Sequence, residues 1–421
     1  MRHGDAERRR RGEELSRKTE DAKIEKVAGR IATLPNVSAT PRLRVSAPEI
    51  NWTKVNRVLV VRLRSIGDTV LATPSLIALK RFLPEAQIDI LLEDWVAPVL
   101  EGFDAVDNVL AVGKDNKSRL KTAWQIRRNN YDVAFNLHGG TTATFFVRAS
   151  GAKHLVGYKN YQYSFFYNHL LASSADFWQR EKTHSAEQQL ALLGFVGVPV
   201  SDRSKSRLVV TEKASDSVET KLKEIFTAEA RRGAEFSRRF SRRSSAETPR
   251  LCGEEFALFH PAAAFDTKQW ATENFARVAE FLFEKGLPTI AVATKSERGV
   301  LEKLRETSRV PIAIFDDLIL PEITALASKA KIFVGNDSGI AHIAAAVETP
   351  SVVIFGSSNI NHWRPWTNAP NEIVFEKMLC QPCAGYFCKE FSEPECIKRV
   401  SVENVTEAVE KVLVDETTVK S

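Results

Sequence analysis

The 421-residue sequence lacks a hydrophobic run long enough to cross a membrane, because no stretch reaches the roughly 18–20 unbroken apolar residues that a spanning helix needs. Residues 1–11 are charged and contain no apolar segment of the kind found in a secretory signal peptide. The five cysteines are too few, and odd in number, for a disulfide-built secreted scaffold. We therefore expect a cytosolic protein.

Most of the chain also lacks an excess of positive charge, although the formal net charge is +6. Residues 1–50 carry 12 Lys and Arg against 8 Asp and Glu, and residues 228–250 carry 7 Arg against 3 Glu. Each segment thus has a net charge of +4, which leaves −2 for the rest. Such runs are usually solvated tails. Attraction to an anionic membrane is the next interpretation, and the lack of interleaved aromatics disfavours nucleic-acid binding.

The chain contains ample material for a globular core. Hydrophobic residues make up 43% of it, with 24 Phe and 7 Trp, which excludes a disordered or fibrous protein, and the length predicts two domains. Short apolar runs alternate with helix-length spacers, a pattern that predicts parallel, doubly wound α/β sheets. The expected strands are 57–63, 88–92, 109–112, 132–137, 256–260, 288–293, 311–315, 331–335 and 351–355.

The two halves repeat the same strand–helix pattern, which predicts two Rossmann-like domains with a ligand in the cleft between them; neither half carries the glycine fingerprint of dinucleotide binding. A helix is expected over 273–286, with Gly286 at its C-terminus, and another over 402–414. We divide the chain into five segments. Residues 1–50 form a basic N-terminal arm, either disordered or helical, and residues 51–200 a first Rossmann-like domain. Residues 201–255 form a linker with the Arg/Ser-rich insertion, residues 256–400 a second Rossmann-like domain with the cysteine cluster, and residues 401–421 a C-terminal helix with its tail.

Two loops at expected strand ends carry the strongest candidates for chemistry. In the first, Ser65, Gly67 and Asp68 follow the strand, and Asp68 is either a helix N-cap or a carboxylate base facing the cleft. In the second, residues 334–342 join a strand to a helix whose N-terminus suits phosphate. Its candidates are Asp337, Ser338, Gly339 and His342, although a lone histidine is more often structural.

Two further loops supply weaker candidates. Lys268 follows the strand at 256–260 and could provide a cation for a diphosphate, although a loop lysine is usually surface decoration. Glu297 follows the strand at 288–293, where a carboxylate could bind ribose hydroxyls. Four cysteines, Cys380, Cys383, Cys388 and Cys396, could hold a structural zinc or could be reduced packing residues.

Side by side, these segments resemble glycosyltransferase family nine, the ADP-heptose:lipopolysaccharide heptosyltransferases. The resemblance runs from about Arg57 to Val414, and its most specific stretches are 58–84 and 334–356. It implies a GT-B fold and an inverting, metal-independent transfer of heptose from ADP-heptose to the lipopolysaccharide inner core, either Kdo-lipid A or an already heptosylated core. The implied acceptor lies at the inner face of the cytoplasmic membrane, and the charge of the two basic segments suggests that they tether the protein there as a peripheral enzyme. The nearly neutral body of the chain argues against a nucleic-acid partner.

The resemblance also implies roles for individual residues. Asp68 would be the general base, with Ser65 and Gly67 on the acceptor side. Lys268 would contact the donor diphosphate and Glu297 the adenosine ribose, while the diphosphate and sugar would meet Asp337, Ser338, Gly339 and His342. The loop before Lys268 lacks the usual glycine or hydroxyl residues, and the turn at 294–297 lacks the usual glycine.

Two alternatives stay open at this point. One is a GT-B transferase that uses another nucleotide-sugar for a different surface glycan. The other is a non-catalytic, membrane-associated scaffold on the same fold, which the intact set of candidate residues disfavours.

Overall fold

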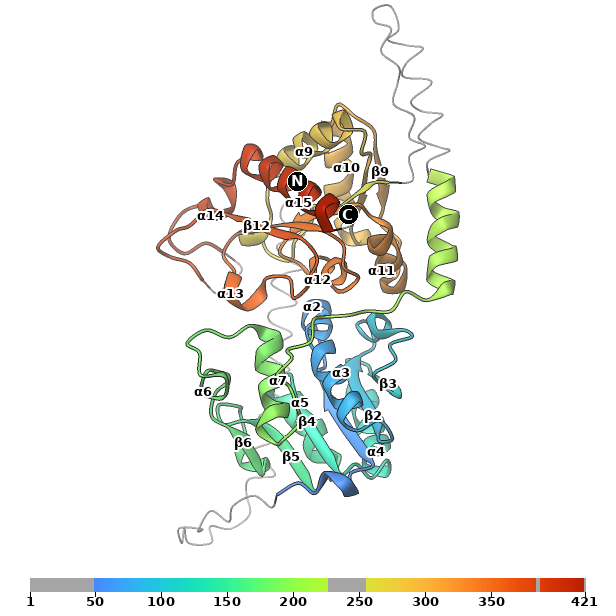
Figure 1. The fold of residues 1–421 in the computed structure, drawn as a ribbon, viewed down its shortest axis with the longest axis vertical. Helices are drawn as coiled ribbons and strands as arrows, with labels where there is room; N and C mark the ends of the chain where they lie inside the picture. Colours follow the sequence, from blue (N-terminus) through green and yellow to red (C-terminus); the bar gives the residue numbers. More distant parts are fainter. Residues whose placement is uncertain (1–48, 226–254, 384–386, 420–421) are drawn as a thin grey trace, which may run out of the picture. The chain divides into compact units, whose positions relative to one another are not determined.

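The computed structural model describes residues 49–225, 255–383 and 387–419. The basic arm up to residue 48 and the Arg/Ser-rich run over 228–250 lie outside the described residues. From Glu49 onward the chain forms one unit, which contains two sheets (Figure 1). Within the described ranges, no helix combines the length and the apolar character needed to cross a bilayer.

The first sheet has six parallel strands in the order β3-β2-β1-β4-β5-β6. The chain leaves the centre at β1, builds outward to β3, and then returns to the other side of β1 with β4. Ligand sites of open α/β sheets form where the strand order reverses in this way. The strands are β1 (Arg57–Val61), β2 (Gln87–Glu93), β3 (Asn108–Val112), β4 (Val133–Asn136), β5 (His154–Tyr158) and β6 (His169–Leu171).

Helices cover both faces of this sheet because side chains alternate along each strand. Val58 and Val60 pack with α3 (Thr73–Phe82) and α7 (Ser185–Phe195), whereas Leu59 and Val61 pack with α4 (Asn116–Arg128) and α5 (Gly140–Ala149). Shorter helices in this half are η1 (Trp52–Lys54), α2 (Ile66–Val70), η2 (Ala97–Leu100), η3 (Ser164–Phe166) and α6 (Ser174–Trp178).

The second sheet repeats the plan with the order β12-β11-β10-β7-β8-β9, again all parallel. Its strands are β7 (Ala257–His260), β8 (Thr289–Val292), β9 (Ile312–Phe315), β10 (Ile332–Asn336), β11 (Ser351–Phe355) and β12 (Asn371–Phe375). Its helices are η4 (Asp266–Lys268), α9 (Thr272–Glu284), η5 (Lys295–Glu297), α10 (Arg298–Thr307), α11 (Leu320–Lys329), α12 (Gly339–Ala346), α13 (Ile360–Trp363), α14 (Glu395–Lys398) and α15 (Val402–Val419).

One face of the second sheet packs on α9, α10 and α15. The other packs on α11 and α12, and this layer shares a continuous apolar cluster with the first half. All nine expected strands are present, and Gly286 follows α9 with a φ of 82°, as expected of a helix-ending glycine. Three further strands, β5, β6 and β12, were not predicted; β6 has three residues, and β6 and β12 lie at sheet edges.

Candidate active site

The loop between β1 and α2 holds the first group of candidate residues. Ser65 has a φ of 72° and is the N-cap of α2, and its Oγ accepts a hydrogen bond of 3.3 Å from the Asp68 backbone N–H. The interpretation of Asp68 as the N-cap is therefore wrong. Because Ser65 takes that role, the Asp68 carboxylate is available for other partners.

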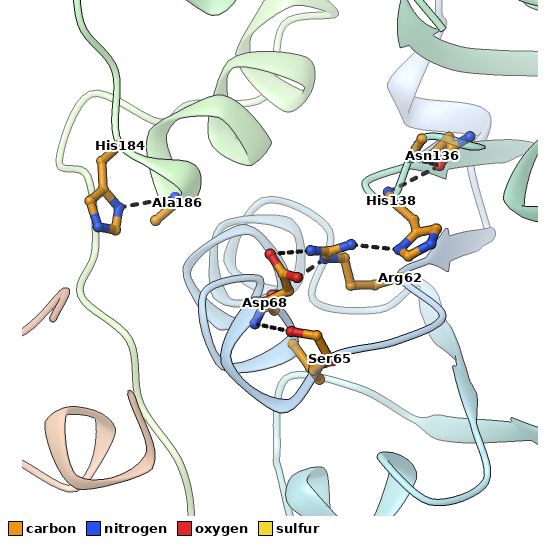
Figure 2. Close-up of polar contacts among 9 residues, drawn as sticks. Arg62, Ser65, Asp68, Asn136, His138, His184 and Ala186 are labelled. Atoms are coloured by element: carbon orange, nitrogen blue, oxygen red, sulfur yellow. Dashed lines mark hydrogen bonds and ion pairs between the residues drawn. The ribbon is translucent and has the colours of Figure 1, made fainter. Parts of the chain in front are cut away.

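The carboxylate pairs with Arg62, and Arg62 in turn contacts His138, which follows the neighbouring strand β4 (Figure 2). Arg62, which follows β1, pairs its guanidinium with Asp68 Oδ1 and donates a 2.7 Å hydrogen bond to Nδ1 of His138. The Asp68 side chain is 17% exposed and that of Arg62 is 7% exposed. Burial, aided by the charge of Arg62, lowers the pKa of His138 to about 4, so its imidazole is neutral near pH 7.

His138 is held in place from its own backbone. Oδ1 of Asn136, the last residue of β4, accepts hydrogen bonds from the backbone N–H groups of His138 (3.0 Å) and Gly139 (2.8 Å). Neither Arg62 nor His138 was among the site residues predicted from the sequence. Both residues follow strands at their carboxyl ends, where α/β sheets build their sites. Their contact could be predicted only with the knowledge that β1 and β4 are neighbours in the sheet.

Asp68 and Arg62 open into a cavity of about 380 Å³, a size suited to a small ligand. Most of its wall comes from the first half, and α13 of the second half closes it with His362 and Trp363. The polar side chains of the wall include His138, Tyr158, Ser173, Ser174, Gln188 and Gln189.

The second group of candidates surrounds the N-terminus of α12. Lys268 Nζ lies 2.7 Å from Asp337 Oδ2, and the hydroxyl of Ser358 donates to the same oxygen (2.5 Å). Ser338 is the N-cap of α12, and its Oγ lies 3.1 Å from Nδ1 of His260. The structure thus brings Lys268, Asp337, Ser338 and the first residue of α12, Gly339, together in one polar cluster at the N-terminus of a helix.

The two groups meet where α2 contacts α12. A Cβ atom added at Gly67 would lie 2.6 Å from Cδ2 of His342, and one at Gly339 would lie 2.9 Å from Cβ of Ile66. Both glycines are therefore required by the close approach of the two helices. The structure places Gly67 against protein here, where the sequence suggested approach to a ligand.

His342 occupies the centre of this junction. Its side chain is buried, and Nδ1 has no hydrogen-bond partner among the described residues. Burial lowers its pKa, the charges of Asp337 and Asp68 oppose this, and Lys268 adds to it. The neutral imidazole of His342 therefore interacts electrostatically both with the Asp68 carboxylate of the first half and with the Lys268–Asp337 pair of the second.

A second cavity, of about 450 Å³, lies at the carboxyl ends of β8 and β9. Its walls are largely apolar and include Trp95, Ile319, Ile323 and Ile340. Glu297 does not line this cavity, and its Oε2 accepts hydrogen bonds from the backbone N–H (3.0 Å) and the hydroxyl (2.7 Å) of Thr294. This capping interaction occupies one oxygen, and a ribose contact by Glu297 stays a prediction.

The four clustered cysteines are all reduced, and Cys396 is buried. Burial raises the pKa values of Cys383 and Cys396, and the other thiols of the cluster raise them further, so the four lie within electrostatic reach. Outside the undescribed stretches, which include 384–386, no three His, Cys, Asp or Glu side chains are grouped closely enough to hold a metal. A structural zinc here stays a prediction.

Comparison with known proteins gives consistent results. The family model of glycosyltransferase family 9 (heptosyltransferase) matches residues 119–392. Lipopolysaccharide heptosyltransferase 3 of Escherichia coli is 27% identical over 317 residues, 73% of this chain and 85% of that protein.

Two solved structures share the fold. A family 9 glycosyltransferase from Veillonella parvula superposes with a TM-score of 0.69 at 18% identity, covering 86% of this chain and 97% of the other. The E. coli ADP-heptose lipopolysaccharide heptosyltransferase II gives 0.65 at 17% identity, covering 86% and 99%. These likenesses confirm the expected GT-B fold.

Proposed function

Because this chain belongs to glycosyltransferase family 9, we propose that it transfers a heptose from ADP-heptose to the inner core of lipopolysaccharide. Its relative from E. coli is a lipopolysaccharide heptosyltransferase, and a solved neighbour is an ADP-heptose heptosyltransferase. The observation that carries the proposal is the contact between α2 and α12: His342 of α12 packs against Gly67, next to Asp68, while the Lys268–Asp337 pair lies beside the start of the same helix α12. The candidate base, Asp68, and the candidate diphosphate site at Lys268 therefore lie on the two sides of the contact between α2 and α12.

The second half would bind the donor. The positive charge of Lys268 and the N–H groups at the start of α12 suit a diphosphate, and both stabilise the negative charge that develops on departing ADP. The apolar cavity lined by Trp95 and Ile340 suits the flat adenine base, and Ile340 belongs to the first turn of α12. These groups supply the positive charge that a divalent ion provides in other transferases, so we propose a metal-independent reaction.

The first half would bind the acceptor and supply the base. Asp68 would take the proton of an acceptor hydroxyl as its oxygen attacks the anomeric carbon. The bond from that carbon to the diphosphate breaks on the opposite side and ADP leaves, so the configuration inverts. Arg62 holds the carboxylate by pairing with Oδ1, which orients the base before the acceptor arrives. The assignment of acceptor and donor domains to residues 51–200 and 256–400 follows from these roles.

We also propose a peripheral location at the cytoplasmic face of the membrane, where a lipid-linked acceptor would lie. Helix α4 presents an exposed face with Leu120 (66% exposed) and Trp124 (62% exposed). Five cations and no acidic residue occur within this helix, at Lys117, Arg119, Lys121, Arg127 and Arg128. A basic face with an exposed tryptophan is suited to the surface of an anionic bilayer.

Release of ADP by the purified full-length chain tests the proposed function. ADP-heptose would be offered with core acceptors of increasing length, in parallel with UDP-, GDP- and CMP-sugars, with and without EDTA. We expect ADP release that requires both ADP-heptose and an acceptor and that resists EDTA. Turnover of a different nucleotide-sugar would support the alternative transferase, and binding of no nucleotide at all would support the scaffold.

A further inference from the structure

The wall of the Asp68 cavity contains a side chain that the mechanism above does not use. Gln189 lies on α7 and is 4% exposed, and neither its amide nitrogen nor its amide oxygen has a hydrogen-bond partner among the described residues. The preceding residue, Gln188, lines the same cavity but is bonded, with its amide nitrogen 3.3 Å from His362 Nδ1 and 3.4 Å from Thr183 Oγ1.

A buried amide with both ends unpaired is unfavourable, because it has lost water without gaining a replacement. Native proteins rarely bury such a group without a partner, and the exceptions often have a functional reason. Gln189 offers one acceptor and two donor positions to a ligand that enters the cavity. Gln189 and Asp68 line the same cavity, and Asp68 would deprotonate a hydroxyl of the acceptor there. The ligand available to the Gln189 amide is therefore the acceptor.

The charges of the described lining identify the chemistry of that molecule. Arg62 is the single cationic side chain among these residues, and its guanidinium already pairs with Asp68 and donates to His138. Burial lowers the pKa of both lining histidines, to about 4 for His138, and thereby keeps them neutral near pH 7. The lining therefore offers no uncommitted cation to a carboxylate or a phosphate.

The remaining polar lining is neutral and suits hydroxyl groups. It consists of hydroxyls and amides, among them Ser173, Ser174, Gln188 and Gln189, while Trp363 supplies an apolar face from α13. Amides and hydroxyls that both donate and accept match the hydroxyl pattern of a sugar ring.

We propose that this cavity holds the reacting sugar of the acceptor as a neutral, hydroxyl-rich ring, and that the Gln189 amide is a specificity-determining contact to its hydroxyls. The inference rests on the proposed function and specifies the kind of acceptor that the enzyme uses. The sugar that receives the heptose carries no acidic group, so the acceptor is a core that already ends in an uncharged sugar.

The first test compares Gln189→Met with the wild-type enzyme. Methionine keeps the length of the side chain and removes the amide, so we expect the protein to fold with unchanged or higher thermal stability. The KM for the acceptor should rise about three- to tenfold, the loss of affinity typical of one good hydrogen bond, with the KM for ADP-heptose unchanged. Thr289→Val is the matched control, because the Thr289 hydroxyl is also buried without a partner but lies on β8, outside this cavity. An unchanged acceptor KM in Gln189→Met would overturn the role of Gln189.

The second test offers the wild-type enzyme two core acceptors, one ending in a neutral heptose and one ending in a sugar that carries a carboxylate. We expect at least tenfold higher kcat/KM for the neutral acceptor. A preference for the carboxylate sugar would overturn the inference while leaving the proposed function intact. Failure to release ADP with either acceptor, despite binding of ADP-heptose, would instead count against the proposed function itself.

Discussion

At the scale of single residues, Lys268 is the side chain on which donor binding should depend most directly. Its ammonium pairs with Asp337 at the N-terminus of α12, where the diphosphate is proposed to lie. We expect Lys268→Met to weaken ADP binding about tenfold or more, the loss of roughly one charge-assisted contact, with a smaller effect on the acceptor KM. Calorimetric titration with ADP measures this.

The matched control for that titration is Lys285→Met. Lys285 also belongs to the second half, but it forms a surface pair with Glu410 in which both side chains are about half exposed, and such pairs contribute little. Equal ADP affinity in the two variants would contradict the placement of the diphosphate at Lys268.

Residues 65–68 and 337–342 could be identified from the sequence because each group follows a strand within one short segment. Arg62 and His138 could not, because their contact spans 76 residues and depends on β4 pairing with β1. Gln189 lies in the segment 184–199, which also resembles the family, but nothing in that segment marks its side chain as functional. Burial and lack of a partner are properties of the packed structure.

At the scale of elements, the contact between α2 and α12 aligns the two halves of the proposed site. We expect Gly67→Ala to destabilise the protein by about 1–3 kcal/mol and to impair turnover, because its methyl group would overlap the ring of buried His342. Thermal unfolding and ADP release on the same sample measure both effects.

Gly299→Ala provides the comparison for that experiment. Gly299 lies in α10, and a Cβ atom added there meets nothing within 4 Å. Because alanine favours a helix more than glycine does, this variant should be neutral or stabilised by up to about 1 kcal/mol. Comparable destabilisation by the two substitutions would show that the α2–α12 contact is not as tight as described.

The strand pattern shows what sequence reasoning can and cannot supply for elements. Buried parallel strands such as β1, β10 and β11 are continuous apolar runs and were predicted directly. By contrast, β6 has three residues at a sheet edge, and β12 is also an edge strand, with partly exposed residues. The edge strands β3 and β9 were nevertheless predicted and the internal strand β5 was missed, so position in the sheet does not by itself decide which strands the sequence reveals.

At the scale of the whole molecule, buried histidines couple stability to pH. Burial lowers the pKa from its ordinary value of 6.5 to about 4 for His138, His169 and His260 and to about 3 for His184. Below pH 6.5 the unfolded chain binds protons that the folded chain does not. The free energy of unfolding should therefore fall as pH drops from about 7 toward 4, by up to about 1.4 kcal/mol per pH unit for each histidine.

Urea unfolding at pH 7 and pH 5 measures this loss. His184 caps α7 by accepting from the Ala186 N–H, a role that asparagine can take over without titrating. The His184→Asn variant should therefore lose less stability between the two pH values than the wild type does. Parallel losses in both proteins would refute the contribution of His184.

Membrane association is also a property of the whole molecule. We expect the Lys121→Glu/Trp124→Ser double variant to bind vesicles with anionic lipids several-fold more weakly than the wild type, because it changes the charge and the aromatic residue of the α4 face. Phe375→Ser, which alters a 41% exposed aromatic in the second half, is the control. Unchanged binding of the α4 variant, with binding lost on deletion of residues 1–50 and 228–250, would assign the contact to the basic segments instead.

The measurement that tests the central claim most directly is turnover of Asp68→Asn with ADP-heptose and a core acceptor at saturating concentrations. The amide keeps the size of the carboxylate and an oxygen for Arg62, but it cannot take a proton at neutral pH. We predict that turnover falls about 10²–10⁴-fold while ADP affinity stays within about twofold of the wild type. Full turnover in Asp68→Asn, or a loss that comes only from weaker ADP binding, would contradict the role of Asp68 as the base.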